Sequence, residues 1–298
     1  MKKVLIILLI AMMMAGVLVG CGGGTDENTI IVGSKQFTEN IVLAEMYAQL
    51  IEHHTDINVE RRMNLGGTPV IFPALMNGEV HLYPEYSGTV FNEIMRLDFV
   101  DVTTEEIFRT AVAGLYADYG VVMFNSIGIN NTFAIGVLRE KAEAYGLSTL
   151  SDLAAISEDI RFGGNHIFFT RDLDGYPNMV EVYGINFIES LRMDQSLLYD
   201  AIVQGSLDAI MVYATDAHLL SHDMVILDDN LGAFPAYQAA PVILAETLER
   251  FPELNDILDL LAGRLTDDRM QQLNYEVAIN NRTPADVASE FLNELGLI

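Results

Sequence analysis

The sequence predicts an α/β protein, and two observations support this fold class. Short β-rich runs alternate with helical patterns from residue 29 almost to the end of the chain, which is typical of layered α/β domains with mostly parallel strands. Of the 298 residues, 51% are hydrophobic, enough for one large core or two moderate cores. We therefore expect a folded, globular protein.

Strands are predicted from β-rich runs or from strict alternation of apolar and polar side chains. They are expected at 29–32, 57–65, 80–83, 121–124, 132–138, 160–162, 207–213, 224–227 and 238–244. Helices fill the intervals, including one at 178–183 and one that ends at Gly205, and from Glu253 onward the pattern is helical only. No internal sequence repeat is visible.

The ends of several predicted helices carry local signals. Threonine at an N-cap accepts a backbone N–H, proline fits the first turn, and glycine ends a helix. Helix starts are expected at Thr38, at Thr68-Pro69, at Thr103 with Glu106 as a capping box, and at Thr283-Pro284. Helix ends are expected at Gly78 and Gly120.

The first residues predict secretion. Lys2 and Lys3 precede an apolar run at 4–19, the order found in signal peptides. A retained transmembrane helix is the alternative, but it needs about 20 apolar residues. We therefore interpret residues 1–20 as a signal peptide that is removed from the mature protein.

Cys21 follows the signal in the order Leu18-Val19-Gly20-Cys21, which resembles the bacterial lipoprotein box. In that motif the chain is cut before the cysteine, whose sulfur carries a diacylglycerol. Cys21 is the only cysteine, so the mature chain has no internal disulfide. The glycines that follow predict a flexible tether at 21–28. We expect a protein anchored by lipid to the outer face of the cell membrane.

The formal net charge of −26 excludes nucleic acid as a partner, because phosphate binding needs clustered Lys and Arg. We interpret the acidity mainly as a well-solvated surface. A sharper hypothesis is adaptation to a salty medium, where counterions screen the repulsion between carboxylates over less than about 10 Å.

Motifs for catalysis and metal binding match poorly. His218 and His222 have helical ligand spacing, but the segment lacks the glutamate of a zinc protease, so surface histidines are the better interpretation. Gly33-Ser34-Lys35 matches only the end of a phosphate-binding loop, and Asn28 replaces its first glycine. No Gly-x-Ser-x-Gly elbow is present. We predict no enzyme, no metal site and no cofactor.

Six segments, in order, resemble the substrate-binding proteins of ABC importers for glycine betaine, choline, carnitine and related osmoprotectants. They share aromatic residues at predicted strand ends and turns, although each aromatic alone is better explained by packing in the core or at an interface. The segments are 33–39 (GSKQFTE), 83–89 (YPEYSGT), 130–134 (NNTFA), Arg171 with 174–177 (DGYP), 213–216 (YATD) and 234–237 (FPAY).

The resemblance implies a type II two-lobe binding-protein fold with the ligand in the cleft. It implies a first lobe of residues 29–130 with 236–298, and a second lobe of residues 131–235. It also implies an aromatic cage that holds a quaternary ammonium by cation–π attraction, with walls at Tyr86, Phe133, Tyr213 and Tyr237. Arg171 is then placed to hold a ligand carboxylate bidentately, and Gln36, Thr89 and Asn131 to add polar contacts.

The sequence departs from the family pattern at two points. Phe133 replaces the usual tyrosine, which keeps the aromatic face and loses a hydroxyl. The loop after Arg171 is one residue longer than usual, because Asp172-Leu173 precede Asp174-Gly175.

The resulting hypothesis is a lipid-anchored, monomeric receptor that captures a quaternary-ammonium osmoprotectant and delivers it to an ABC permease. One alternative within the class is a binding protein for another small cationic or zwitterionic solute. More distant alternatives are a lipid-anchored hydrolase and a purely structural surface lipoprotein.

Overall fold

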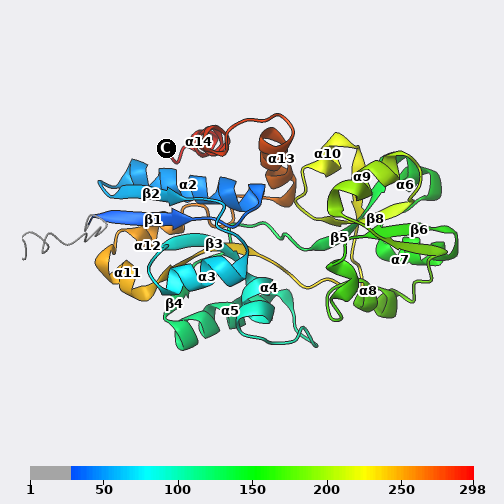
Figure 1. Cartoon of the computed structure of the whole chain (residues 1–298), viewed down its shortest axis with the longest axis horizontal. Helices are drawn as coiled ribbons and strands as arrows, with labels where there is room; N and C mark the ends of the chain where they lie inside the picture. Colours follow the sequence, from blue (N-terminus) through cyan, green and yellow to red (C-terminus); the bar gives the residue numbers. More distant parts are fainter. Residues whose placement is uncertain (1–27) are drawn as a thin grey trace, which may run out of the picture.

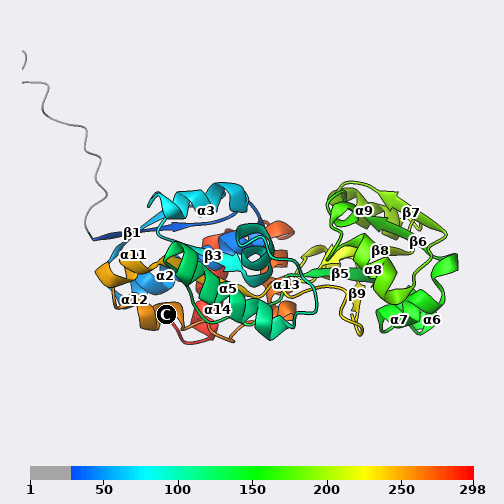
Figure 2. The same cartoon turned by 90° about the horizontal axis from the view of Figure 1, so that it is seen from below.

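The computed structural model describes residues 28–298, whose elements form two groups, each built around a five-stranded sheet. Figure 1 shows the two groups side by side, joined by extended segments that run from one to the other. Figure 2, turned by 90°, shows the same separation. The α/β class is confirmed. The predictions for the signal peptide, Cys21 and most of the tether lie outside the described residues.

The first sheet has the strand order β2-β1-β3-β10-β4. Its strands are β1 (Thr29–Gly33), β2 (Asn58–Arg62), β3 (Leu82–Tyr86), β4 (Val121–Met123) and β10 (Ala239–Leu244). The second sheet has the order β7-β6-β8-β5-β9. Its strands are β5 (Phe133–Leu138), β6 (Arg161–Gly164), β7 (Glu189–Arg192), β8 (Ala209–Tyr213) and β9 (Met224–Leu227).

Both sheets are mixed: four of the five strands run in the same direction, as the expectation of mostly parallel strands requires, and one strand is reversed. In the first sheet, β1 pairs in parallel with β2 and β3, whereas β10 is antiparallel to β3 and β4. The second sheet repeats this pattern, with β5 in the place of β10. The cause is the route of the chain, because β5 and β10 are entered by extended segments and not by a helical crossover, which parallel pairing requires.

Helices cover both faces of each sheet. In the first group they are α2 (Thr38–His54), α3 (Thr68–Met76), α4 (Ser87–Thr89), α5 (Thr104–Tyr119), α11 (Ala245–Arg250), α12 (Leu254–Leu258), α13 (Asp267–Ala278) and α14 (Pro284–Glu294). In the second they are α6 (Arg139–Tyr145), α7 (Leu150–Ala155), α8 (Tyr176–Tyr183), α9 (Gln195–Val203) and α10 (His218–Ser221). Short 3₁₀ turns lie at Ser157–Asp159 and Phe168–Thr170, and a π-helix lies at Val90–Ile94.

Strand β10 shows why two helical layers are needed. Ala239 and Ile243 belong to a buried cluster with α2, α12, α13 and α14, whereas Ala240 and Val242 belong to a second cluster with α3 and α5. Successive side chains of a strand point to opposite faces, so an apolar strand must be covered on both sides. This burial on both faces holds the strand in place between the two helical layers.

Two of the predicted helix starts are one residue displaced. The capping box at Thr103 and the cap at Thr283 are confirmed, as is the helix end at Gly120. Thr38 and Thr68 do not cap their helices, because Phe37 and Gly67 occupy the N-cap positions. The Thr68 hydroxyl instead accepts a hydrogen bond from Lys35 Nζ at 2.9 Å.

Several contacts join the two groups. The crossing segments pair with each other, since Asn130 bridges Gln238 and the Asn131 N–H donates to the Tyr237 carbonyl at 3.1 Å. On another side, α13 donates from Gln271 Nε2 to the carbonyl of Ala214 at 2.7 Å. Arg171 of the second group also contacts Tyr237 and Glu93, so side chains contribute to the relative position of the sheets together with the backbone pairing and α13.

Candidate functional site

One cavity of about 330 Å³ brings together all eight residues predicted to bind a ligand. They come from both groups of elements, and Gln36 is exposed at the opening whereas Thr89 is buried. The eight residues are Gln36, Tyr86, Thr89, Asn131, Phe133, Arg171, Tyr213 and Tyr237. Their roles toward a ligand stay predictions.

Phe133 and Tyr213 form the part of the wall that belongs to the second sheet. Phe133 starts β5, Tyr213 ends the antiparallel strand β8, and the two residues are paired in register. Their ring centroids are 5.4 Å apart with planes 34° apart. Both residues lie at the same end of two adjacent strands, so their rings lie together in the space between the two sheets.

Tyr86 and Tyr237 come from the first sheet. Tyr86 ends β3, and its register partner Ala239 starts β10, so Tyr237 lies just beyond the same edge. The Tyr86 hydroxyl donates to Glu39 Oε1 at 2.7 Å, and burial raises the pKa of Tyr86 well above its ordinary value. The ring therefore stays neutral and is held in one orientation by its hydroxyl.

Gly88 allows the Tyr237 ring to reach the cavity. A Cβ atom at Gly88 would lie 2.7 Å from Tyr237 Cδ1 and Cε1 and 2.8 Å from the Ala236 carbonyl oxygen. These distances are shorter than any ordinary carbon contact, so a larger residue would displace the ring. The Gly88 in the predicted segment at 83–89 therefore has a packing role that its position alone did not indicate.

Arg171 is already engaged within the protein. Its Nε and Nη2 donate to Asp174 Oδ1 and Oδ2 at 2.7 and 2.6 Å. Nη2 also donates to the Tyr237 hydroxyl at 2.6 Å, and that hydroxyl donates to Asp174 at 2.7 Å. Burial disfavours the charge of Arg171, but these bonds outweigh it and raise its pKa.

The expected bidentate grip of Arg171 on a ligand carboxylate stays a prediction, and in this structure Asp174 holds the guanidinium in that way. A bidentate pair uses two adjacent N–H groups, and Asp174 occupies the edge that the side chain presents best. Only Nη1 has no close acceptor in the structure, its nearest carboxylate being Glu93 at 3.8 Å. Arg171 can thus offer a ligand one end of its guanidinium.

The loop after Arg171 is closed by a tight turn. The Gly175 N–H donates to the Arg171 carbonyl at 3.0 Å. A Cβ at Gly175 would lie 2.2 Å from the Phe168 carbonyl oxygen, so only glycine fits this close approach. The turn brings Asp174 back onto Arg171, which explains how the longer loop still places both residues at the cavity.

Lys35 also lines the cavity, and no role was predicted for its side chain. Its ammonium lies 2.5 Å from Glu85 Oε1 and 5.3 Å from the centroid of the Tyr86 ring. Both side chains are buried, and a buried ion pair is stable only when each charge is fully partnered. Lys35 is therefore neutralised by Glu85 and supports the back of the Tyr86 ring.

Other lining residues could not be found from the motifs. Phe37 lies in the segment at 33–39, but Glu93 and Ile167 lie in none of the six segments. Glu93 belongs to the π-helix, a distortion that is frequent at functional sites. The Glu93 carboxylate lies 3.8 Å from Arg171 Nη1, whereas Asp174 pairs with the same guanidinium at 2.6 Å. Glu93 is therefore the less closely paired carboxylate, and it favours a positive charge in the site.

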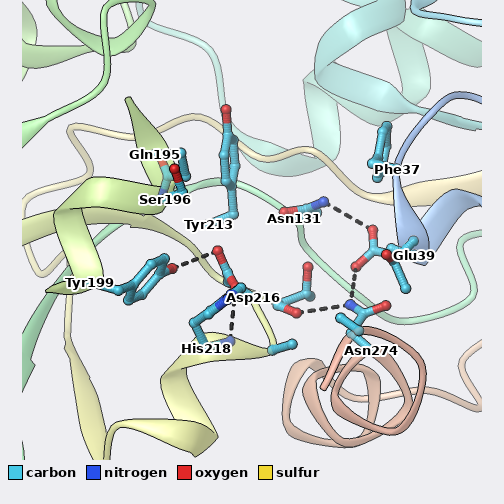
Figure 3. Close-up of a pocket in the computed structure, with 14 residues that line it drawn as sticks. Phe37, Glu39, Asn131, Gln195, Ser196, Tyr199, Tyr213, Asp216, His218 and Asn274 are labelled. Carbon is cyan, nitrogen blue, oxygen red and sulfur yellow. Dashed lines mark hydrogen bonds and ion pairs between the residues drawn. The ribbon is translucent and has the colours of Figure 1, made fainter. Parts of the chain in front are cut away.

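A second cavity of about 550 Å³ adjoins the first and shares Phe37, Asn131 and Tyr213 with it. Figure 3 shows Glu39 at its edge, between Asn131 and Asn274 of α13. Glu39 accepts from their amide groups at 3.0 and 3.4 Å. Burial raises the pKa of Glu39, although hydrogen bonds from Thr215, Tyr86, Asn274 and Asn131 act against this shift.

His218 also lines the second cavity, and its ring is held by Asp216. Its Nδ1 lies 3.0 Å from Asp216 Oδ1, and its ring stacks on Tyr199 at 4.6 Å between centroids. The His218 pKa is raised because Asp216 stabilises the imidazolium. Among residues 28–298, no group of three or more His, Cys, Asp or Glu side chains is arranged to hold a metal ion.

The family model described as "Substrate binding domain of ABC-type glycine betaine transport system" matches residues 28–294. The chain is 33% identical to the "Ergothioneine transport permease/ergothioneine binding protein EgtU" of Helicobacter pylori, over 91% of this chain and 48% of that protein. It is 30% identical to the "Carnitine transport binding protein OpuCC" of Listeria monocytogenes, over 91% and 88%. The chain thus spans about half the length of the first relative and most of the second.

Solved structures show the same fold. One described as "glycine betaine/carnitine/choline ABC transporter" superposes with a TM-score of 0.85 at 31% identity, covering 90% of this chain and 99% of the other. The apo form of YehZ from Escherichia coli superposes at 0.78 with 25% identity, covering 91% and 99%. In the part of the chain that the structure describes, every helix is too short or too polar to cross a bilayer.

Proposed function

Because the chain belongs to the family of substrate-binding domains of ABC-type glycine betaine transport systems, we propose that it captures a quaternary-ammonium osmoprotectant in an aromatic cage. Glycine betaine, choline and carnitine are the proposed ligands, and an ABC permease is the proposed recipient. Members of this family bind substrates for import and are not enzymes. The observation that carries the proposal is the convergence of four aromatic side chains on one cavity.

The chemistry of the ligand explains the aromatic walls. A trimethylammonium group carries a full charge but has no N–H to donate, so ordinary hydrogen bonds cannot hold it. Aromatic faces offer diffuse negative potential worth about 0.5 to 2 kcal/mol each, and they fill the space around the methyl groups. Tyr86, Phe133, Tyr213 and Tyr237 are proposed for this role.

The charges already in the site support a cationic ligand. The guanidinium of Arg171 lies 5.8 Å from the Phe133 ring centroid and 6.0 Å from that of Tyr237, but Asp174 neutralises it. Glu85 neutralises Lys35 in the same way. A ligand cation therefore meets aromatic faces and Glu93, and its carboxylate has Arg171 Nη1 within the same cavity.

Closure of two lobes is the proposed mechanism of capture. We propose that residues 29–130 with 236–298 form one lobe and residues 131–235 the other. The proposal is supported by the two sheets, whose strands come from these separate parts of the chain. Tyr86 and Tyr237 then close against Phe133 and Tyr213, and a permease can distinguish the closed form from the empty one.

A lipid on Cys21 is proposed to hold the mature protein, as a monomer, at the outer face of the membrane beside its permease. We expect Cys21→Ser to release the protein from the membrane and impair uptake, because the tether sets the local concentration of captured ligand. Membrane fractionation and uptake of labelled ligand measure these effects. Unchanged affinity of the purified variant is the control, and membrane retention of Cys21→Ser would contradict the anchor.

Titration calorimetry with glycine betaine, choline, carnitine and proline betaine tests the ligand class. We expect saturable binding of at least one of the four and no binding of the ammonium compound glycine, which lacks the methyl groups. No heat with any of the four at millimolar concentration would overturn the proposed function.

A second candidate is another small zwitterion that carries a trimethylammonium group. The relative of Helicobacter pylori named for ergothioneine favours this candidate, because ergothioneine is also a betaine. Competition between glycine betaine and ergothioneine in the same titration would rank the two.

A further inference from the structure

The Tyr237 ring is held from several sides. It packs against Gly88, and its hydroxyl accepts a hydrogen bond from Arg171 at 2.6 Å and donates to Asp174 at 2.7 Å. A further neighbour is Phe99, whose ring centroid lies 6.0 Å from that of Tyr237. Phe99 belongs to none of the six predicted segments and does not line the cavity of about 330 Å³. It therefore contacts Tyr237 from outside the cavity.

Phe99 is itself held by a deeper ring. Its centroid lies 5.3 Å from that of Phe91 with the two planes 16° apart, whereas the planes of Phe99 and Tyr237 are 57° apart. Both separations fall in the range of about 4.5 to 7 Å over which aromatic rings attract each other. Phe91 belongs to the π-helix and is 4% exposed. The three rings thus form a row that runs from the interior of the first group to the cavity.

The loop at 96–103, between the π-helix and α5, carries Phe99 and is fixed at both ends. Near its start, the Leu97 N–H donates to the Phe91 carbonyl at 3.0 Å, and the Leu97 carbonyl accepts from Asn92 Nδ2 at 3.0 Å. At its end, Thr103 forms the capping box of α5. The backbone on either side of Phe99 is therefore tied to neighbouring elements.

The middle of this loop follows a strained path. Arg96 and Asp101 have φ angles of 58° and 50°, in the left-handed region that is costly for residues other than glycine. Such residues keep this conformation only where the surrounding structure requires it. Asp98 and Val100 are exposed, whereas Phe99 between them is partly buried. Between the two strained residues, Phe99 is therefore the side chain that turns back onto the protein.

We propose that Phe99 is a positioning residue, which holds the Tyr237 ring in the wall of the cage without touching the ligand. The inference rests on the proposed function, because that function assigns Tyr237 to the cage. A side chain that is ordered before the ligand arrives adds no ordering cost to binding, so the support from Phe99 raises affinity through Tyr237. The bonds of the Tyr237 hydroxyl fix one end of the side chain, and Phe99 fixes the tilt of the ring.

Two substitutions of Phe99 separate its ring from the rest of the loop. The probe is the tightest-binding of glycine betaine, choline, carnitine and proline betaine, measured by titration calorimetry. We expect Phe99→Ala to weaken binding of this probe at least threefold, because the Tyr237 ring loses its support. Phe99→Tyr keeps an aromatic ring at this position and should stay within about twofold of wild type. Unchanged affinity of Phe99→Ala would overturn the inference.

Val100→Ala is the matched control on the same loop. Val100 follows Phe99 directly and is 58% exposed, so this substitution alters the loop but none of the three rings. We expect its affinity for the probe to stay within about twofold of wild type. A loss as large as that of Phe99→Ala would show that the loop acts as a whole, which contradicts a role of the Phe99 ring.

A double-mutant cycle with Tyr237 tests whether Phe99 acts through this residue. Tyr237→Ala removes the ring that Phe99 supports, so we expect Phe99→Ala to change the affinity by less than about 1.5-fold in that background. A residue that only stabilises the fold would not show this dependence. If Phe99→Ala weakens binding by the same factor with and without the Tyr237 ring, the two residues act independently and the inference is wrong.

Failure of this inference is distinguishable from failure of the proposed function. Absence of binding of all four probes to the wild-type protein would remove the proposed function and the inference with it. Binding to wild type together with an unchanged affinity of Phe99→Ala would remove the inference alone. If circular dichroism shows that Phe99→Ala does not fold, Phe99→Leu, which keeps the apolar volume without a ring, replaces it in the same cycle with the same expected outcomes.

Discussion

Tyr213 separates the contribution of an aromatic face from that of a hydroxyl. Its ring lies beside Phe133 and lines both cavities. We expect Tyr213→Ala to weaken binding of glycine betaine about tenfold or more, because the cation loses one aromatic face and its packing. Tyr213→Phe keeps the face and should stay within about threefold of wild type. Titration calorimetry measures both, and equal losses would contradict the cage.

Substitution of Gly88 tests the aromatic cage without changing any of the four aromatic side chains. The added methyl of Gly88→Ala would meet the Tyr237 ring at 2.7 Å, so the ring must move away from the cavity. We expect the affinity for the ligand to fall at least fivefold, with a smaller loss of stability. Unchanged affinity of Gly88→Ala would show that Tyr237 does not form a wall.

The sequence motifs predicted which residues converge but not how they are partnered. The eight predicted residues were found because each lies in a segment that resembles a known family. The pairing of Arg171 with Asp174 depends on a turn that only Gly175 permits, and no spacing rule indicates it. Asn274 and Gln195 were missed because they come from distant helices without any motif.

The start of helix α2 brings Glu39 into a buried position, 3% exposed, where it accepts hydrogen bonds from Asn131 of the first crossing segment and from Asn274 of α13. Burial raises its pKa above 4.5, so the unfolded chain releases this proton at lower pH than the folded protein does. The folded state therefore loses stability relative to the unfolded state as pH rises from about 4.5 through the folded pKa.

We expect this loss to disappear in Glu39→Gln, which cannot ionise. The measurement is the difference in free energy of unfolding between wild type and Glu39→Gln, by urea denaturation from pH 4 to pH 8. Wild type should lose stability relative to the variant as pH rises. A difference that is independent of pH would mean that Glu39 titrates normally.

Among the elements, the strand that was not predicted from the sequence, β7, has a mostly polar sequence. Strand β7 has the sequence ESLR and lies at the edge of the second sheet, where only one neighbour supports it. An edge strand can be polar because it is not buried on both sides. The displaced cap at Gly67 has a tertiary cause, since the Thr68 hydroxyl accepts a hydrogen bond from Lys35 instead of capping its own helix.

At the scale of the whole molecule, the net charge of −26 makes stability sensitive to salt. Self-repulsion among carboxylates is screened over about 10 Å at 0.1 M salt and about 3 Å at 1 M salt. We therefore expect the free energy of unfolding to rise between 0.1 M and 1 M sodium chloride. Urea denaturation at each concentration measures it, and a flat response would remove the hypothesis of adaptation to a salty medium.

The central position of β10 also determines when each half of the molecule can fold. The second sheet is complete once residue 227 is available, because its strands are continuous in the chain. The first sheet stays divided until residues 239–244 arrive, since β4 pairs only with β10. When the chain is synthesised from its N-terminus, its middle part should therefore fold first. The residues made earliest should complete their fold only after the last quarter of the chain has been made.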